Sequence, residues 1–277
     1  MPQDIKVNLG THLLEEGKNV AINDPLSKKI GAKFDEGLPD TIILHYTAGP
    51  SVESAINTLV HSDTKASAHL VVGRDGSVTQ LVPFDTIAWH AGRSSFGGRS
   101  GFNKYSIGIE IVNAGHLQKE RDQYKAWFGK TYPQDQVLEA SHQNHSSPRF
   151  WHTYTKEQID CVLNLCTQLK EAYSIKEILG HDEIAPSRKT DPGPAFPLES
   201  VRSQVLGREE DSGDGIASEG VVIATKLNIR HGPNSNADLA GPPLPGGTKV
   251  KILNEKEGWY EVEVTKRGWV SKNFIES

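Results

Sequence analysis

The stretch SIGIEIVN, residues 106–113, alternates strictly between two kinds of position. Successive side chains of an extended strand point to opposite faces, so one face carries three isoleucines: Ile107, Ile109 and Ile111. The other face carries Gly108, Glu110 and Val112. The pattern predicts a strand with one apolar face and with Glu110 aimed away from it, where the small neighbour Gly108 leaves room for a ligand.

Strands and helices are predicted on both sides of this stretch. TIILHYTA, residues 41–48, is typical of a buried strand, and SVESAINTLVHS, residues 51–62, repeats apolar side chains at helical spacing. AHLVVG and SVTQLVP are predicted to form a hairpin around Arg74-Asp75-Gly76. A long helix is expected from Thr155, which makes a capping-box pattern with Gln158. Together they predict an α/β (α+β) domain with a mixed central β-sheet flanked by helices.

Two segments interrupt this pattern. Residues 114–147 are polar and weakly patterned, and we interpret them as an insertion or long loop. REEDSGDGIASEG, residues 208–220, is acidic and rich in Gly and Ser, as a flexible linker is. Short β-rich runs broken by Pro and Gly follow and predict a small all-β barrel. We therefore expect an N-terminal extension packed on the mixed-sheet domain (1–40), that domain (41–205), a linker (206–219) and the barrel (220–277).

The composition narrows the class of ligand. The chain has 277 residues, of which 23% are charged, and a formal net charge of −5. It has no basic surplus to neutralise phosphates, so we do not expect nucleic acid as a partner. A neutral polymer or a small molecule fits this composition better.

Neither the cysteines nor the N-terminus indicates a compartment. Cys161 and Cys166 lie five positions apart on the predicted helix, about 7.5 Å along its axis and on different sides, beyond disulfide reach. The N-terminal residues contain no apolar run long enough for a signal sequence or a transmembrane segment. Three alternatives stay open: the sequence lacks its export signal, the protein leaves the cell by another route, or it works inside.

Three residues suggest a metal site. GHDEIAPSRKTDPGPAF, residues 180–196, sets His181 and Asp191 ten positions apart across a proline-broken loop, and His45 ends an apolar strand. Two imidazoles and one carboxylate leave a fourth position for water on a tetrahedral Zn²⁺, as in catalytic zinc sites. Spacing alone leaves an alternative open, namely a hydrogen-bonded pair at the surface.

The chain from about residue 41 to residue 197 resembles the zinc-dependent N-acetylmuramoyl-L-alanine amidases of the type 2 family, which includes amidase-type phage lysozymes and peptidoglycan recognition proteins. The matching motifs are ILHYTAG, SAHLVVGRDGSVTQLVPFDTIAWHAG, SIGIEIVN and GHDEIAPSRKTDPGPAF. Several of them look most like bacterial amidases that act on 1,6-anhydromuropeptides. The resemblance implies three zinc ligands and two catalytic residues: His45, His181 and Asp191, and then Glu110 and Lys189.

These residue types suit amide hydrolysis. Zinc generates a nucleophilic water at neutral pH, and Glu110 is positioned to accept its proton and pass it to the leaving amine. The ammonium of Lys189 would stabilise the oxygen that becomes negative. The alternatives are a solvent-facing glutamate and a surface lysine.

Three further residues are candidates for contact with substrate. His90, in AWHAG, is either a cleft residue or a neutral structural histidine. His69 either supports the metal site through a hydrogen bond or fills its strand. Trp89 either presents an aromatic face to sugar or lies in the core. The other seven histidines show no partner pattern and are expected at the surface.

The tail resembles bacterial SH3 domains in LNIRHGP, GWYEVEV and GWVSKNFI. Such modules usually bind cell-wall peptides or polysaccharide, so the resemblance implies a targeting role. The inserted PPLP, residues 242–245, departs from the usual loop. A packing domain that braces the catalytic domain is the alternative.

The sequence thus predicts a peptidoglycan hydrolase that cuts the amide between N-acetylmuramic acid, in its 1,6-anhydro form or not, and L-alanine. Peptidoglycan or muropeptides are the expected partners, and the substrate implies the cell envelope. Two alternatives remain: a cytoplasmic recycling amidase for soluble anhydromuropeptides, and a peptidoglycan-binding protein without activity.

Overall fold

The computed structural model describes residues 5–15, 17–145, 147–207, 218–234, 237–256 and 259–264. The chain divides into two compact units, Met1–Glu210 and Asp211–Ser277. Most of the expected linker and the whole GWVSKNFI motif lie outside the described residues. No helix in the described ranges is long and apolar enough to cross a membrane.

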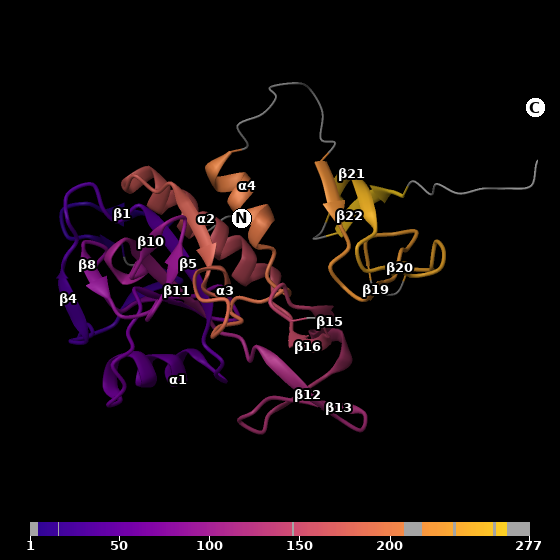
Figure 1. The fold of residues 1–277 in the computed structure, drawn as a ribbon, viewed down its shortest axis with the longest axis horizontal. Helices are drawn as coiled ribbons and strands as arrows, with labels where there is room; N and C mark the ends of the chain where they lie inside the picture. Colours follow the sequence, from indigo (N-terminus) through magenta and orange to yellow (C-terminus); the bar gives the residue numbers. More distant parts are fainter. Residues whose placement is uncertain are drawn as a thin grey trace, which may run out of the picture. The chain divides into compact units, whose positions relative to one another are not determined.

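The first unit is built on a six-stranded mixed sheet in the order β17-β5-β11-β6-β7-β3. Figure 1 labels two of its central strands, β5 and β11, which are hydrogen-bonded neighbours. Its strands are β3 (Val20–Ile22), β5 (Thr41–Tyr46), β6 (Leu70–Val72), β7 (Val78–Gln80), β11 (Ser106–Ile111) and β17 (Glu177–Gly180). Strand β5 runs parallel to both β17 and β11, and β11 runs parallel to β6. Strands β6 and β7 form the predicted antiparallel hairpin, and β3 pairs with β7 in parallel. The predicted mixed sheet is confirmed.

One face of this sheet packs against two helices, α2 (Lys156–Ala172) and α4 (Leu198–Leu206). The three isoleucines of β11 lie in that core together with Ile42 and Leu44 of β5. Thr155 caps α2 in the predicted capping box with Gln158. Both cysteines are free and buried in α2, where they pack as small apolar side chains.

The opposite face carries shorter elements. Helix α1 (Val52–Ile56) continues into a π-helical turn, Asn57–His61, and packs on Val71 and Val112. Helix α3 (His181–Ile184) begins directly after β17 and packs on Ile43. This face therefore leaves room for polar side chains at the ends of the central strands.

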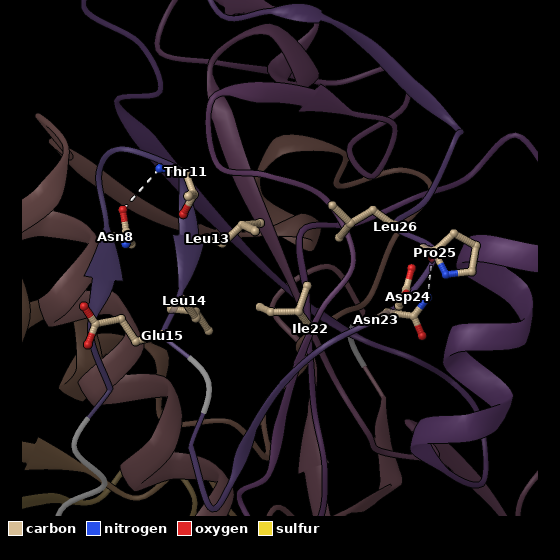
Figure 2. A pocket seen from close by; sticks show the side chains of 10 residues that line it. All are labelled: Asn8, Thr11, Leu13, Leu14, Glu15, Ile22, Asn23, Asp24, Pro25 and Leu26. Atoms are coloured by element: carbon tan, nitrogen blue, oxygen red, sulfur yellow. Dashed lines mark hydrogen bonds between the residues drawn. The ribbon is translucent and has the colours of Figure 1, made fainter.

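The residues before β5 form part of the first unit. They contribute β1 (Val7–Asn8), β2 (Leu13–Leu14), β3 and β4 (Ile30–Lys33), and β4 pairs with β8 (Thr86–Ala88). Ile5, Leu14 and Val20 lie in the main core. A hollow of about 570 Å³ opens beside β2 and β3 (Figure 2). None of the predicted site residues is among those that line it.

The interpretation of residues 114–147 as a loop is wrong. They and the residues that follow form a five-stranded antiparallel sheet, which we call the insert sheet: β12 (His116–Glu120), β13 (Gln123–Lys125), β14 (Thr131–Tyr132), β15 (Val137–Ser141) and β16 (Pro148–His152). The insert sheet has a small core of its own around Leu117, Tyr124 and Tyr132. Its strands are two to five residues long, too short for alternation to stand out against their polar faces.

The described part of the second unit consists of short strands, as predicted. Strands β18 (Ser218–Val221), β21 (Lys249–Lys256) and β22 (Trp259–Glu263) form one antiparallel sheet. Strands β19 (Lys226–Leu227) and β20 (Leu244–Pro245) form a second pair. Part of the PPLP segment is therefore a strand.

Buried His69 makes the fold sensitive to acid. Its Nε2–H donates to the carbonyl of Thr86 at 2.9 Å, and its Nδ1 accepts from the amide of Gly108 at 3.0 Å. Burial lowers the pKa of His69 from 6.5 to about 4. Between these values the unfolded chain binds a proton that the folded chain does not, so the free energy of unfolding falls as the pH falls.

We expect His69→Gln to reduce that pH dependence by up to about 1.4 kcal/mol per pH unit. Urea unfolding between pH 4.5 and 7.5, in excess chelator, measures the slope for both proteins. Equal slopes would show that His69 does not contribute.

Candidate metal centre and catalytic residues

The register of three parallel strands brings the candidate residues together. Glu110 on β11 pairs with His45 on β5, so both side chains point to the same face of the sheet. Gly180 on β17 pairs with Leu44, which places His181 one residue further along, beside His45. The carboxyl ends of parallel strands meet at one edge of a sheet, where ligands commonly bind.

His45, His181 and Asp191 form a buried cluster that can hold a metal ion. The Nδ1 atoms of the two histidines are 2.8 Å apart, and each is 2.9 Å from Oδ2 of Asp191. The loop between His181 and Asp191 folds back on itself: the amide of Asp182 donates to the carbonyl of Asp191 at 2.8 Å.

A chain of hydrogen bonds fixes the tautomer of His45. A backbone carbonyl only accepts, so the contact of 3.2 Å between His90 Nε2 and the Ser106 carbonyl places a proton on that nitrogen. The Nδ1 of His90 is then an acceptor, and Nε2–H of His45 donates to it at 3.0 Å. His45 therefore directs an unprotonated Nδ1 toward Asp191. Burial, followed by the nearby His181, lowers the pKa of His45 to about 4, so it is neutral at pH 7.

The same reasoning applies to His181. Its Nε2 lies 3.1 Å from the carbonyl of Ala91 and donates to it, which leaves Nδ1 as a lone pair. The carboxylate of Asp191 lies against both lone pairs, with its Oδ2 2.9 Å from each Nδ1. Three lone pairs thus converge with no proton between them. That arrangement fits a divalent cation, which relieves their mutual repulsion.

Glu110 lies on the strand next to His45 and is partly buried, with its Oε2 atom out of contact with solvent. Its Oε2 has no hydrogen-bond partner among the described residues, a costly state for a carboxyl group. Burial, and then the charge of Asp191, raises the pKa of Glu110 to about 8, while the charge of Lys189 opposes that rise. Lys189 is only partly buried and follows the turn after α3. Glu110 lies on β11, and Lys189 lies in residues 181–193, which carry two of the candidate ligands and which we call the ligand loop. Lys189 is close enough to influence the pKa values of both Glu110 and His45.

Comparison with known proteins agrees with this geometry. Residues 35–194, more than half of the chain, match the family model for N-acetylmuramoyl-L-alanine amidase. The chain belongs to this amidase family. Residues 225–276 match the model for the bacterial SH3 domain. Both predicted resemblances are confirmed.

The amidase is similar in sequence to several bacterial amidases. It is 31% identical over 215 residues to the 1,6-anhydro-N-acetylmuramyl-L-alanine amidase AmpD of Escherichia coli, covering 72% of this chain and 98% of AmpD. It is 34% identical over 210 residues to AmpD of Citrobacter freundii, covering 70% and 95%. It is 29% identical over 180 residues to E. coli AmiD, an N-acetylmuramoyl-L-alanine amidase, covering 62% of this chain and 55% of AmiD. A crystal structure of AmpD aligns with a TM-score of 0.49 at 26% identity, over 72% of this chain and 98% of that one.

Of the three residues predicted to contact substrate, two are buried and one is exposed. His69 is fully buried and both its ring nitrogens bind backbone groups, so it fills its strand and is not available to a substrate. His90 is buried with both nitrogens occupied, and it contacts His45 rather than a cleft. Trp89 is 40% exposed, so its interpretation as a core residue is wrong.

Two histidines that we expected at the surface are buried in the amidase, His142 and His152. Nε2–H of His142 donates to Oδ2 of Asp182 at 2.9 Å, and the side-chain amide of Asn144 donates to the Asp182 carbonyl at 3.0 Å. Asp182 directly follows His181, a candidate metal ligand. The insert sheet is therefore attached to the ligand loop by contacts that no spacing pattern in the sequence reveals.

The prediction that Gly108 leaves room for a ligand is wrong. A Cβ at this position would overlap the ring of His90. The glycine instead lets His90 pack against β11, from where it holds His45 in the required tautomer.

We expect Gly108→Ala to displace His90 and to weaken metal binding by about 10- to 100-fold. Competition with a chromogenic chelator for added Zn²⁺ measures the affinity. Gly17→Ala is the matched control, since an added Cβ there meets open space. Unchanged affinity in Gly108→Ala would show that His90 does not orient His45.

Proposed function

We propose that this amidase is a zinc-dependent hydrolase of the bond between the lactyl carbonyl of N-acetylmuramic acid and the amino group of L-alanine. The observation that supports it best is the convergence of three lone pairs, from His45, His181 and Asp191, beside the buried carboxyl of Glu110. Nitrogen and carboxylate ligands in this number suit catalytic zinc.

We assign the metal ligands as His45, His181 and Asp191. When bound, zinc supplies Lewis acidity and makes water a nucleophile at neutral pH. The hydrogen bonds from His45 to His90 and from His181 to Ala91 hold both imidazoles in the ligating tautomer before the metal arrives.

Glu110 is the proposed general base and acid. It accepts the proton of the attacking water and then gives it to the nitrogen of the departing L-alanine. A general base is most effective when its pKa is close to the working pH, and burial brings the pKa of Glu110 to about 8. Its unpaired Oε2 is free to receive that proton.

Lys189 is the proposed stabiliser of the developing negative charge. It lies two positions before Asp191, close enough to Glu110 and His45 to influence both their pKa values. An ammonium at this place balances the charge on the carbonyl oxygen as it becomes tetrahedral.

We expect Glu110→Gln to lower kcat by about 10²- to 10⁴-fold, because the shape is kept and the proton acceptor is lost. Lys189→Ala should lower kcat by about 10²- to 10³-fold. Both proteins should bind one equivalent of Zn²⁺ with affinity close to that of the parent. Loss of Zn²⁺ from Glu110→Gln would contradict its role as base and make it a ligand.

We further propose that the substrate is peptidoglycan or muropeptide, with the second unit binding the cell wall in the cell envelope. The match of residues 225–276 to bacterial SH3 domains supports this. The second candidate is a cytoplasmic recycling amidase for soluble anhydromuropeptides. It is favoured by the AmpD relatives, whose names specify the 1,6-anhydro sugar.

A digest distinguishes these functions. The full chain is incubated with purified sacculi or with soluble anhydromuropeptides, and the products are identified by mass spectrometry. We expect peptides that begin with L-alanine, lost on chelation, restored by Zn²⁺ and absent with Glu110→Gln. Release from sacculi supports the envelope enzyme, and release from soluble anhydromuropeptides alone supports recycling. No release from either substrate contradicts the proposed function.

A further inference from the structure

Trp127 is the most exposed large apolar side chain in the described parts of the chain, with 77% of its surface accessible. It lies in the turn between β13 and β14 of the insert sheet. Covering this aromatic surface with a ligand would be favourable, and tryptophan is enriched at binding interfaces.

The indole ring is nevertheless held in place. Its Nε1–H donates to the carbonyl of Ala48 at 2.7 Å, across 79 positions of sequence. The ring of Phe128 meets it edge-on, with centroids 5.7 Å apart and planes at 85°. The turn is closed by hydrogen bonds between Ala126 and both Gly129 and Lys130. An aromatic group ordered in advance loses little entropy when a ligand binds.

The anchor point places Trp127 at the metal edge of the central sheet. Ala48 lies two residues beyond the end of β5 and three beyond His45. Tyr46, between them, contacts the ligand loop through a hydrogen bond of 2.6 Å between its hydroxyl and that of Thr190. The indole is thus fixed to the same strand end that carries the candidate metal ligand.

The insert sheet also contacts the ligand loop. Besides the bond between His142 and Asp182, the ring of Trp151 in β16 packs over Gly193, where a Cβ would lie 3.3 Å from it. Contacts with both the end of β5 and the ligand loop hold the insert sheet at a set distance from the cluster. Trp127 is therefore anchored on a sheet that contacts both segments carrying the candidate metal ligands.

We propose that Trp127 forms a saccharide subsite, in which its exposed face stacks on the sugar joined to the muramic acid of the substrate. This inference rests on the proposed function. The indole carries no charge, and its single donor already binds Ala48, so it offers only an apolar face. The C–H face of an N-acetylglucosamine ring matches that face, whereas the charged stem peptide would require ionic partners.

The test compares two soluble substrates that differ by one sugar: the anhydromuramyl peptide and the same peptide with N-acetylglucosamine attached. In the parent enzyme the added sugar should raise kcat/KM. In Trp127→Ala that preference should fall about tenfold, while hydrolysis of the smaller substrate stays within about twofold. Trp127→Phe should retain most of the preference, because it keeps an aromatic face. Leu9→Ala, which removes another exposed apolar side chain, should leave both rates unchanged.

Three outcomes would overturn the subsite: an unchanged preference in Trp127→Ala, an equal loss on both substrates, or a Trp127→Phe enzyme as defective as Trp127→Ala. An equally defective Trp127→Phe enzyme would show that Trp127 acts only through its hydrogen bond to Ala48. Equal loss would point to the peptide or to folding instead.

A binding measurement separates this inference from the proposed function. Calorimetric titration of the peptide-free disaccharide, N-acetylglucosaminyl-anhydromuramic acid, into the full chain should show about tenfold weaker binding for Trp127→Ala. If neither substrate is hydrolysed, the proposed function fails and this titration still decides the role of Trp127. Equal affinity for both proteins would refute the subsite even in an active enzyme.

Discussion

The parallel register of β17, β5 and β11 is the constraint on which the rest of the site depends. It aligns Glu110 with His45 and places His181 one residue past the pairing of Gly180 with Leu44. A slip of one residue would turn His45 into the core and an isoleucine into the site. The apolar side chains that alternate with the site residues, Ile42 and Leu44 on β5 among them, prevent that slip because they fill the core under α2.

Backbone carbonyl groups determine the tautomers of the histidines in the candidate metal centre. The backbone carbonyls of Ser106 and Ala91 decide which nitrogen of His90 and of His181 carries a proton. From His90 that choice passes to His45 through one more hydrogen bond. The protein thus specifies a ligating tautomer with two carbonyl groups, and it avoids an additional buried carboxylate that would compete for the cation.

The sequence predicts what local patterns encode and misses what only tertiary contacts determine. Alternation placed Glu110 on the correct face of β11, and the capping box located the start of α2. Strand ends and loop spacing suggested a metal site but left a hydrogen-bonded pair at the surface as an alternative, and the family resemblance implied the three candidate ligands. By contrast, the insert sheet is stabilised by cross-strand pairs in strands too short to show a period. The burial of His142 depends on Asp182, forty positions away, and the filling of the space above Gly108 depends on a histidine from another loop. Neither of these two contacts can be recognised from the sequence around the residues involved.

The two thiols inside α2 have a consequence for where such a fold can operate. Burial raises the pKa of Cys161 to about 12 and raises that of Cys166 as well. Thiolates are the species that react with oxidants and disulfides, and these two stay protonated and out of reach of solvent. The chain has no other cysteine. Its covalent structure is therefore indifferent to redox potential, and the same folded protein would persist in a glutathione-rich interior or in an oxidising exterior.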